Sequence, residues 1–343
     1  MTERGNTTEA RRSIPGGSAL RLLRRLRLEE FLFVLLFIPS TVVTIWANAE
    51  LARAGVSSRK IEGGIVRLGV VVLVAVGLTF LDRYARSRPR NRVVRGVVDF
   101  FRTMLPFALC SAVYTNLHDT VRFVNPHDIH VALVALEEWM FGLQPVLWAE
   151  RFITPARTEF FSFFYANFFL VAPSVAIVLW FSKRRAEARE TLLGVILCFY
   201  TGYILYVIFP AAPPRLYFES LGLFTVNLEG GFITNFQNAL LEMLPNHASR
   251  AAFPSLHAAV SFVSLYYAWR YSRWFFPILL FFVIGLVAST VYLRHHYVVD
   301  LIAGLPLVPW TAWITPRLDR WWGNQPYLRG AEGDCRTLDR PLR

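Results

Sequence analysis

The sequence has little charge for its length and almost no lysine. Charged residues make up 17% of the 343 residues, whereas soluble domains carry about 25%. Lysine occurs only as Lys60 and Lys183, so nearly all of the 36 basic residues are arginine. The three cysteines do not suggest a disulfide framework, since Cys110 and Cys198 lie in apolar stretches and Cys335 lies in a polar tail. The scarcity of charge argues against an ordinary soluble domain.

Hydrophobic residues are what the chain has in excess, at 55% of the sequence, with aromatic residues at 15%. Such an aromatic content excludes a disordered chain. The apolar residues occur in long blocks, which disfavours a soluble nucleic-acid binder despite the net charge of +12. Because about 20 apolar residues cross a bilayer, the blocks divide the chain into membrane spans. The expected partner is therefore the membrane bilayer, and no nucleic acid is expected.

We predict an all-α, polytopic membrane protein with about eight transmembrane helices. The candidate spans are 31–49, 65–81, 100–124, 160–182, 191–211, 253–270, 274–293 and 297–315. The predicted domains are a basic cytoplasmic tail (1–30), two N-terminal spans with a basic cytoplasmic loop (31–99), a core (100–316) and a disordered cytoplasmic tail (317–343). No cleavable signal peptide is visible, so the first apolar block is expected to be an uncleaved anchor.

The distribution of basic residues indicates the orientation, because cytoplasmic connections are enriched in arginine and lysine. With the N-terminus in the cytoplasm, 25 of the 36 basic residues fall in inside segments and 8 fall outside. This split predicts an integral plasma membrane protein, bacterial by its Arg-rich composition, with both termini cytoplasmic. The outside segment 125–159 is predicted to contain an amphipathic helix on the membrane surface, with a purely structural interfacial helix as the alternative.

Three short polar stretches interrupt the apolar pattern in the second half of the chain. They are 212–215 (A-P-P-R), 253–257 (F-P-S-L-H) and 294–300 (R-H-H-Y-V-V-D). The order of the spans places all three stretches at the outer face of the membrane. Arg215 and Arg294 lie at the outer face although basic residues are concentrated in the inside segments. The orientation of the spans therefore does not explain their position.

The spacing within these stretches points to phosphate chemistry. His296 and Asp300 are four residues apart and share a helix face, and a carboxylate there fixes the histidine tautomer. Ser255 can cap a helix whose N-terminus attracts phosphate, with His257 in its first turn. We predict a phosphoryl-transfer site at the extracytoplasmic face. Its predicted catalytic residues are His296, His257 and Asp300, its phosphate-binding residues are Arg215, Arg294 and Ser255, and further candidates are Arg250, His295 and Tyr297.

Other kinds of site fit the sequence less well. A zinc site would use the histidines and Asp300, but the chain has no H-E-x-x-H or paired-cysteine motif, and no metal is expected. A rhomboid-like protease would need a glycine-rich serine motif inside a span. A transporter or flippase for an anionic lipid remains the main alternative, with a pathway along Arg102, Arg122, Arg215 and His296. A non-catalytic scaffold would leave the clustered histidines unexplained.

At these motifs the sequence resembles the type 2 phosphatidic acid phosphatase superfamily of membrane lipid phosphatases and phosphotransferases. That family is recognised by K-x6-R-P, P-S-G-H and S-R-x5-H-x3-D. Residues 254–257 match the second motif with leucine in place of glycine, and Ser289, His296 and Asp300 match the third. The form of these motifs is most similar to the inositol phosphorylceramide synthase-like branch, which contains inositolphosphotransferases.

Two positions depart from the family pattern. Ile208 stands where the first motif has lysine, and Thr290 stands where the third has arginine. Pro214 also precedes Arg215 instead of following it. These departures affect the phosphate-binding positions and leave the histidines and the aspartate in place.

The resemblance implies a six-helix core of the phosphatidic acid phosphatase and haloperoxidase type over 100–316, with the first two spans as an addition. It also implies a mechanism in which His296 forms a phosphohistidine, Asp300 orients it and His257 serves as acid and then as base. It implies no cofactor, a lipid phosphate as donor, and water or a polyol such as inositol as acceptor. The motifs leave hydrolysis and transfer open, because both acceptors would meet the same histidine pair.

Overall fold

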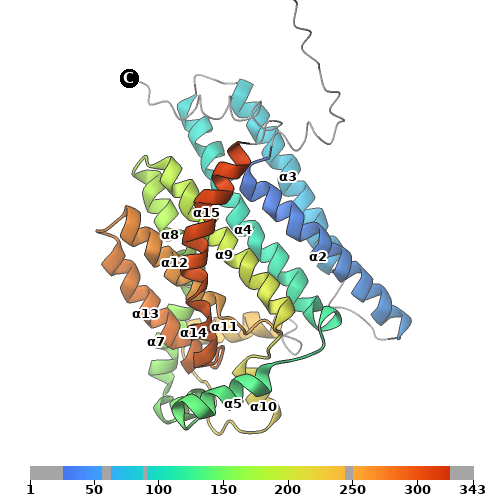
Figure 1. Cartoon of the computed structure of the whole chain (residues 1–343), viewed down its shortest axis with the longest axis vertical. Coiled ribbons are helices and arrows are strands. Elements are labelled where there is room, and N and C mark those ends of the chain that lie inside the picture. The colour runs from blue at the N-terminus through green and yellow to red at the C-terminus, as the bar shows by residue number, and fades with distance from the viewer. Residues whose placement is uncertain (1–25, 56–62, 88–90, 244–249, 325–343) are drawn as a thin grey trace, which may run out of the picture.

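Helices make up most of the residues that the computed structural model describes, which are 26–55, 63–87, 91–243 and 250–324 (Figure 1). The helices are α2 (Leu28–Arg53), α3 (Gly63–Ser87), α4 (Arg92–Val124), α5 (His130–Phe141), α6 (Pro145–Trp148), η1 (Ala149–Phe152), α7 (Pro155–Ala166), α8 (Phe168–Phe181), α9 (Arg185–Ile208), α10 (Pro214–Ser220), α11 (Phe232–Met243), α12 (Leu256–Tyr271), α13 (Phe276–Tyr292), α14 (Val298–Gly304) and α15 (Leu307–Gly323). The prediction of an all-α fold is confirmed for these residues.

Four segments of the described chain are long and apolar enough to cross a bilayer. They are α2, the Val93–Leu117 part of α4, α9, and Val298–Gly323, which joins α14 and α15. Two bent helix pairs, α5 with α6–η1 and α7 with α8, raise the number to six if each pair is one span. Helices α12 and α13 have 16 and 17 residues, fewer than the roughly 20 of a typical span. The predicted count of eight spans stays a prediction.

The fourth predicted span, 160–182, is two helices joined at Asn167. The first helix begins earlier, at Pro155, and the two helices meet at an angle of 42°. The side-chain amide of Asn167 donates to the carbonyl of Phe163 at 2.7 Å. A polar side chain that bonds its own backbone competes with the helix ladder, so the apolar run bends at this residue.

The bundle is organised around α9, which packs against α4, α8, α12 and α15. Helix α9 is apolar on every side, and its residues 191–200 are all buried, as expected for a central helix. Helices α2 and α3 pack on α4 and form an outer layer at one side (Figure 1).

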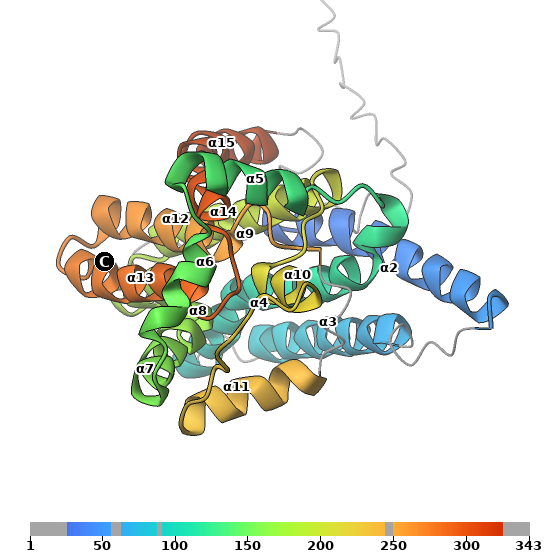
Figure 2. The ribbon, with the colours of Figure 1, turned by 90° about the horizontal axis from the view of Figure 1, so that it is seen from below.

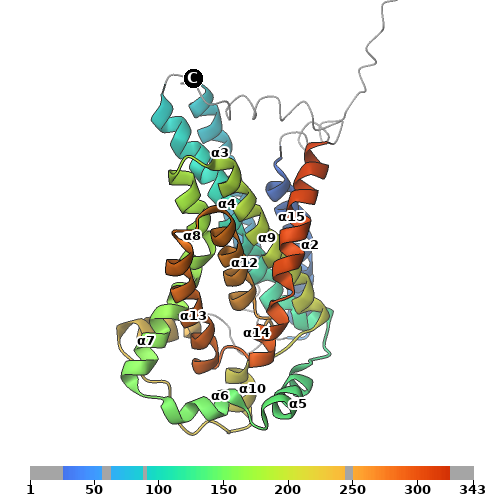
Figure 3. The ribbon, with the colours of Figure 1, turned by 60° about the vertical axis from the view of Figure 1, so that its left-hand side comes forward.

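The lower end of the bundle in Figures 1 and 3 is covered by helices that run across the long helices. Helices α5, α6 and α10 lie there, and Figure 2 shows the same cover from below with α11 at one edge. The covering helices include the predicted surface segment 125–159, which forms α5, α6, η1 and the start of α7. The polar stretches of the sequence meet beneath this cover.

A buried polar cluster fastens the outer layer to the bundle. The side-chain amide of Asn116 on α4 donates to Ser40 and Thr41 of α2 at 3.3 and 3.0 Å. Arg67 of α3 donates to the amide oxygen of Asn116 at 2.7 Å. A buried amide with its donors and its acceptor all engaged holds three helices in one register.

Candidate active site

Main-chain hydrogen bonds tie the three polar stretches together. The N–H of Ser255 donates to the carbonyl of Asp300 at 3.0 Å, which joins the start of α12 to α14. The N–H of Arg215 donates to the carbonyl of Arg294 at 2.8 Å, which joins α10 to the α13–α14 turn. The structure therefore brings together the stretches that the order of the spans placed at one face.

The two histidines of the predicted site contact each other directly. Nδ1 of His257 lies 3.1 Å from Nε2 of His296, and Nδ1 of His296 lies 3.3 Å from Oδ2 of Asp300. The same Oδ2 accepts the N–H of Tyr297 at 3.0 Å, so it acts as an acceptor there. If His296 donates through Nδ1 to this oxygen, its Nε2 carries the lone pair and His257 is the donor between the rings.

This arrangement depends on how α12 and α14 begin. Ser255 is the N-cap of α12, and its hydroxyl accepts the N–H of Ala258 at 3.4 Å. The N–H groups of His295 and His296 both donate to the carbonyl of Thr290, which closes the turn after α13. The buried N–H and hydroxyl of Ser255 thus have partners within the protein, and its predicted contact with phosphate stays a prediction.

Positive charge and burial keep the histidines of the turn neutral. Burial lowers the pKa of His296 to about 3, and the charge of Arg215 acts in the same direction, against a backbone hydrogen bond at Ala252. Burial and the charge of Arg215 also lower the pKa of His295 well below its ordinary value. A neutral imidazole has a lone pair for attack on phosphorus, so the site suits a histidine nucleophile.

Arg294 and Arg250, by contrast, are engaged with acidic partners in the cover. A guanidinium nitrogen of Arg294 lies 2.7 Å from Glu150 of η1 and also donates to the carbonyl of Val226. Nε of Arg250 lies 2.6 Å from Asp128. Arg294 thus links the α10–α11 connection to η1, and the phosphate contact predicted for it stays a prediction.

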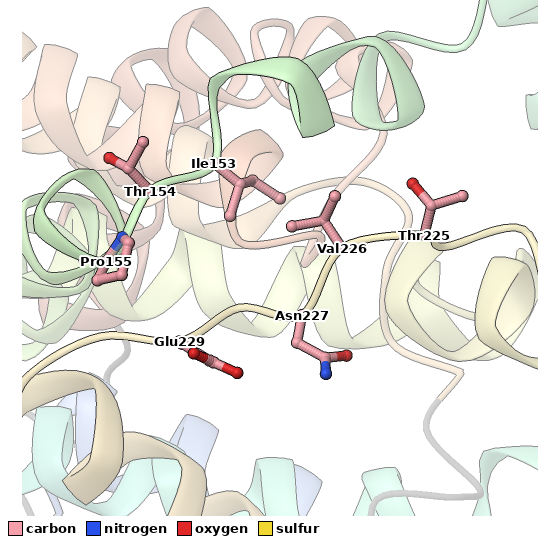
Figure 4. Close-up of a pocket in the computed structure, with 7 residues that line it drawn as sticks. All are labelled: Ile153, Thr154, Pro155, Thr225, Val226, Asn227 and Glu229. Carbon is pink, nitrogen blue, oxygen red and sulfur yellow. The ribbon is translucent and has the colours of Figure 1, made fainter.

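Two cavities of the cover are separate from the histidines. One, of about 310 Å³, lies between the start of α7 and the α10–α11 connection (Figure 4). It is lined by Ile153, Thr154, Pro155, Thr225, Val226, Asn227 and Glu229. The other, of about 450 Å³, is lined by residues of α6, η1, α7 and α13. Since neither lining includes His257 or His296, the contacts of the histidines define the candidate site.

The comparison with known families agrees with this geometry. The family described as the PAP2 superfamily matches residues 131–314, more than half of the chain, and the match includes all three polar stretches. The chain belongs to the PAP2 superfamily. The predicted resemblance to this family of lipid phosphatases and phosphotransferases is thereby confirmed.

Two curated relatives of this PAP2 protein differ in how much of it they cover. The chain is 29% identical over 220 residues to phosphoinositol dihydroceramide synthase of Bacteroides thetaiotaomicron, covering 59% of this chain and 72% of the relative. It is 32% identical over 102 residues to a PA-phosphatase related-family protein of Dictyostelium discoideum, covering 29% of this chain and 18% of that relative. No solved structure matches the chain. The first relative agrees with the predicted inositol phosphorylceramide synthase-like branch.

One residue at the PAP2 site escaped the sequence analysis. The ring of Tyr165, at the end of α7, stacks on His295 with centroids 4.2 Å apart and on His257 at 5.0 Å. In the sequence Tyr165 stands within the aromatic run F-F-S-F-F-Y-A-N-F-F, where nothing distinguishes it from its neighbours. Its place at the site depends on the bend at Asn167, for which the sequence offered no clear signal.

The zinc alternative finds no support in the side-chain positions. Within the residues that the structure describes, no group of three or more His, Cys, Asp or Glu side chains is placed to hold a metal ion. His257, His296 and Asp300 instead form a hydrogen-bonded chain with His296 in the middle.

Gly304 of α14 is the point at which the helix carrying Asp300 meets α12. A Cβ at this position would lie 2.9 Å from the carbonyl oxygen of Ser255. We expect Gly304→Ala to push α14 away from α12, lowering stability by about 1–3 kcal/mol. We also expect kcat to fall about tenfold, because the His257–His296 distance changes. Thermal unfolding and turnover of the purified protein would measure both effects.

Gly69→Ala on α3 is the matched control, since a Cβ there meets nothing within 4 Å. It should leave turnover near that of the wild type and should not lower stability, because alanine is favoured over glycine inside a helix by about 1 kcal/mol. Unchanged stability and turnover in Gly304→Ala would contradict the close packing of α12 and α14.

Proposed function

We propose that this PAP2 protein is an integral membrane lipid phosphatase or phosphotransferase that acts through a phosphohistidine at the extracytoplasmic face. The observation that carries the proposal is the hydrogen-bonded chain of His257, His296 and Asp300, at 3.1 and 3.3 Å. Arg215 supports it, because a positive charge that acts on His296 can also attract a phosphate. Membership of the PAP2 superfamily supports phosphoryl transfer as the reaction class.

The first step of the proposed reaction forms a phosphoenzyme. Nε2 of His296 attacks phosphorus and forms a P–N bond, while the P–O bond to the leaving alcohol breaks. The leaving oxygen takes a proton from His257, and the Asp300 carboxylate stabilises the positive charge that develops on His296. Arg215 would neutralise part of the charge on the phosphoryl oxygens.

The second step returns the enzyme to its starting state. His257 removes a proton from the acceptor hydroxyl, whose oxygen then attacks the phosphohistidine. A new P–O bond forms and the P–N bond to His296 breaks. Water as acceptor gives hydrolysis, and a polyol such as inositol gives transfer.

The substrates follow from the position of the site and from the relatives. His296 lies just before Val298–Gly323, a segment that is long and apolar enough to cross a bilayer, which favours a lipid phosphate as donor. The name of the Bacteroides thetaiotaomicron relative couples phosphoinositol with dihydroceramide, which favours transfer to an alcohol as the reaction to test beside hydrolysis. The excess of basic residues in the predicted inside segments supports an outward-facing site with both termini in the cytoplasm.

A transporter for an anionic lipid has less support from the contacts. Arg102, which such a pathway would use, lies 3.2 Å from Glu30 of α2. Movement of lipid in vesicles without turnover would favour this alternative.

The test is a panel of lipid phosphates offered to the purified protein in nanodiscs, with water and polyols as competing acceptors. We expect release or transfer of the phosphate-containing group in the presence of a metal chelator, identified by mass spectrometry. Rapid acid-free trapping should give a phosphoenzyme that is labile to acid and stable to base. Turnover that depends on added metal, or that never phosphorylates His296, would refute the proposed mechanism.

A further inference from the structure

Helix α5 carries a buried acid although several of its apolar side chains are exposed. It lies across the end of the bundle beside α14 (Figures 1 and 2). Trp139 and Val131 are 82% and 60% exposed, whereas Glu137 is completely buried. Glu138, the next residue, is exposed and accepts from Gln144 at 3.1 Å. The structure thus buries one of two adjacent glutamates.

The contacts of Glu137 are with the start of α14, the helix that carries Asp300. Oε1 of Glu137 accepts the N–H groups of Val298 and Val299 at 2.5 and 3.3 Å. Asp300 accepts the preceding N–H, that of Tyr297, at 3.0 Å. Two carboxylates therefore satisfy three consecutive N–H groups that the first turn of a helix leaves without partners inside the helix.

These N–H groups belong to the segment that joins His296 to Asp300. Val298 and Val299 are the middle of that five-residue turn, so their position sets the geometry between the imidazole and its carboxylate. Asp300 lies on α14 itself. One contact to the start of α14 can therefore hold both the His296 imidazole and the Asp300 carboxylate in position. Glu137 therefore links α5 to the start of α14, whereas Arg294 links the preceding residues of the turn to Glu150 of η1.

Burying the carboxyl group of Glu137 costs free energy that an apolar side chain would not cost. Burial raises the pKa of Glu137 to about 7, and the charge of Asp300 acts in the same direction against the two backbone hydrogen bonds. Its second oxygen, Oε2, is buried without a hydrogen-bond partner among the described residues. A leucine would be easier to bury at this position, but it could not accept from the two N–H groups.

We propose that Glu137 is a positioning residue for phosphoryl transfer, holding the His296–Asp300 turn in its reactive geometry by accepting the N–H groups of Val298 and Val299. The proposal rests on the proposed function of His296 and Asp300. It gives α5 a role in catalysis although none of its side chains is required to touch the substrate. A displacement of about 1 Å in a catalytic group can cost about 100-fold in rate, so one hydrogen-bonded clamp can have a large effect.

The first measurement compares turnover of Glu137→Ala, Glu137→Gln and Glu137→Asp. We expect kcat of Glu137→Ala to fall about 10- to 100-fold, with KM changed less than about threefold. Glu137→Gln keeps an oxygen at the same reach, so its kcat should stay within about threefold of the wild type. Glu137→Asp is one methylene shorter and should behave like the alanine variant. Glu138→Ala, which removes the same group one residue along the helix, should be unchanged.

The second measurement is hydrogen–deuterium exchange of the peptide that covers 294–300, which needs no turnover. We expect this peptide to exchange about tenfold faster in Glu137→Ala than in Glu137→Gln, Glu138→Ala or the wild type, since two amides lose their acceptor. This measurement separates the two proposals. If the wild type turns over no lipid phosphate but the exchange pattern appears, the proposed function is refuted. The stabilisation of the turn by the hydrogen bonds from Val298 and Val299 to Glu137 is then still supported.

Three results would overturn the positioning role. Wild-type kcat in a folded Glu137→Ala protein would show that the clamp has no effect on the reaction. Equal loss of activity in Glu137→Gln would show that the accepting oxygen is not what matters. If Glu137→Ala does not fold, the Gln and Asp variants carry the test, and equal kcat in those two would also contradict the proposal.

Discussion

Replacing His296 with alanine is expected to reduce turnover of a lipid phosphate by at least about four orders of magnitude. Nε2 of His296 would form the P–N bond, and His257 and Asp300 are positioned to support His296 in that role. Removal of a covalent nucleophile costs about as much as removal of the whole catalytic group. Steady-state turnover and phosphoenzyme trapping would both be measured, and the trapped phosphoenzyme should disappear.

His127→Ala is the matched control for this variant. His127 is exposed in the connection between α4 and α5, on the side of the cover, and its removal leaves the buried histidines untouched. It should retain wild-type turnover. A His296→Ala protein that is folded and still forms a phosphoenzyme would exclude His296 as the nucleophile.

Replacing Asp300 with asparagine is expected to lower kcat by about three to four orders of magnitude while the protein stays folded. Oδ2 of Asp300 accepts from both His296 and the N–H of Tyr297. The single oxygen of an asparagine amide could still accept both hydrogen bonds, but the amide has no negative charge to stabilise the imidazolium that would form on His296. Loss of an orienting aspartate in a serine protease triad costs about 10⁴-fold in kcat, which sets the scale here.

The measurement is kcat and KM for the donor in the same nanodisc assay, with thermal unfolding alongside. Because Asp300 is not expected to contact the lipid, KM should change less than kcat. Asp128→Asn is the control for the loss of an acid at the same end of the protein. Asp128 is paired with Arg250 in the cover. A kcat within tenfold of the wild type for Asp300→Asn would remove Asp300 from the proposed mechanism.

The fold was predictable where long apolar runs decide it. The runs gave the helices of the bundle, because a span must satisfy its backbone groups internally. The break at Asn167 was not predicted, since the apolar run continues on both sides and only the bond from its side chain to Phe163 bends the chain. The length of the last helix was also underestimated, because Val298–Gly323 extends beyond the predicted end at 315.

The site was predictable where short spacing determines contact. His296 and Asp300 are four residues apart, so helical geometry alone puts them on one face. Arg294 is different, because its partner Glu150 is 144 residues away and no local pattern links them. A sequence shows that an outside arginine is unusual, but only the folded chain shows which acid it meets.

The contacts of Glu137 were predictable from the sequence only in part. An acid in an otherwise apolar stretch of α5 is visible in the sequence, but its neighbour Glu138 gives the same signal. The difference between them appears only when α14 is placed against α5, with Val298 and Val299 facing Glu137.

The contact between His257 and His296 has a consequence for the resting protein. If Nδ1 of His257 is the donor, the lone pair on Nε2 of His296, the proposed nucleophile, is already hydrogen-bonded at 3.1 Å when no substrate is present. A phosphate group must displace this bond, which opposes binding by about 1 kcal/mol, or about fivefold in affinity. In the resting protein, the bond from His257 thereby shields the His296 imidazole from other electrophiles. When a phosphate ligand displaces this bond, the freed N–H of His257 faces the oxygens of that ligand.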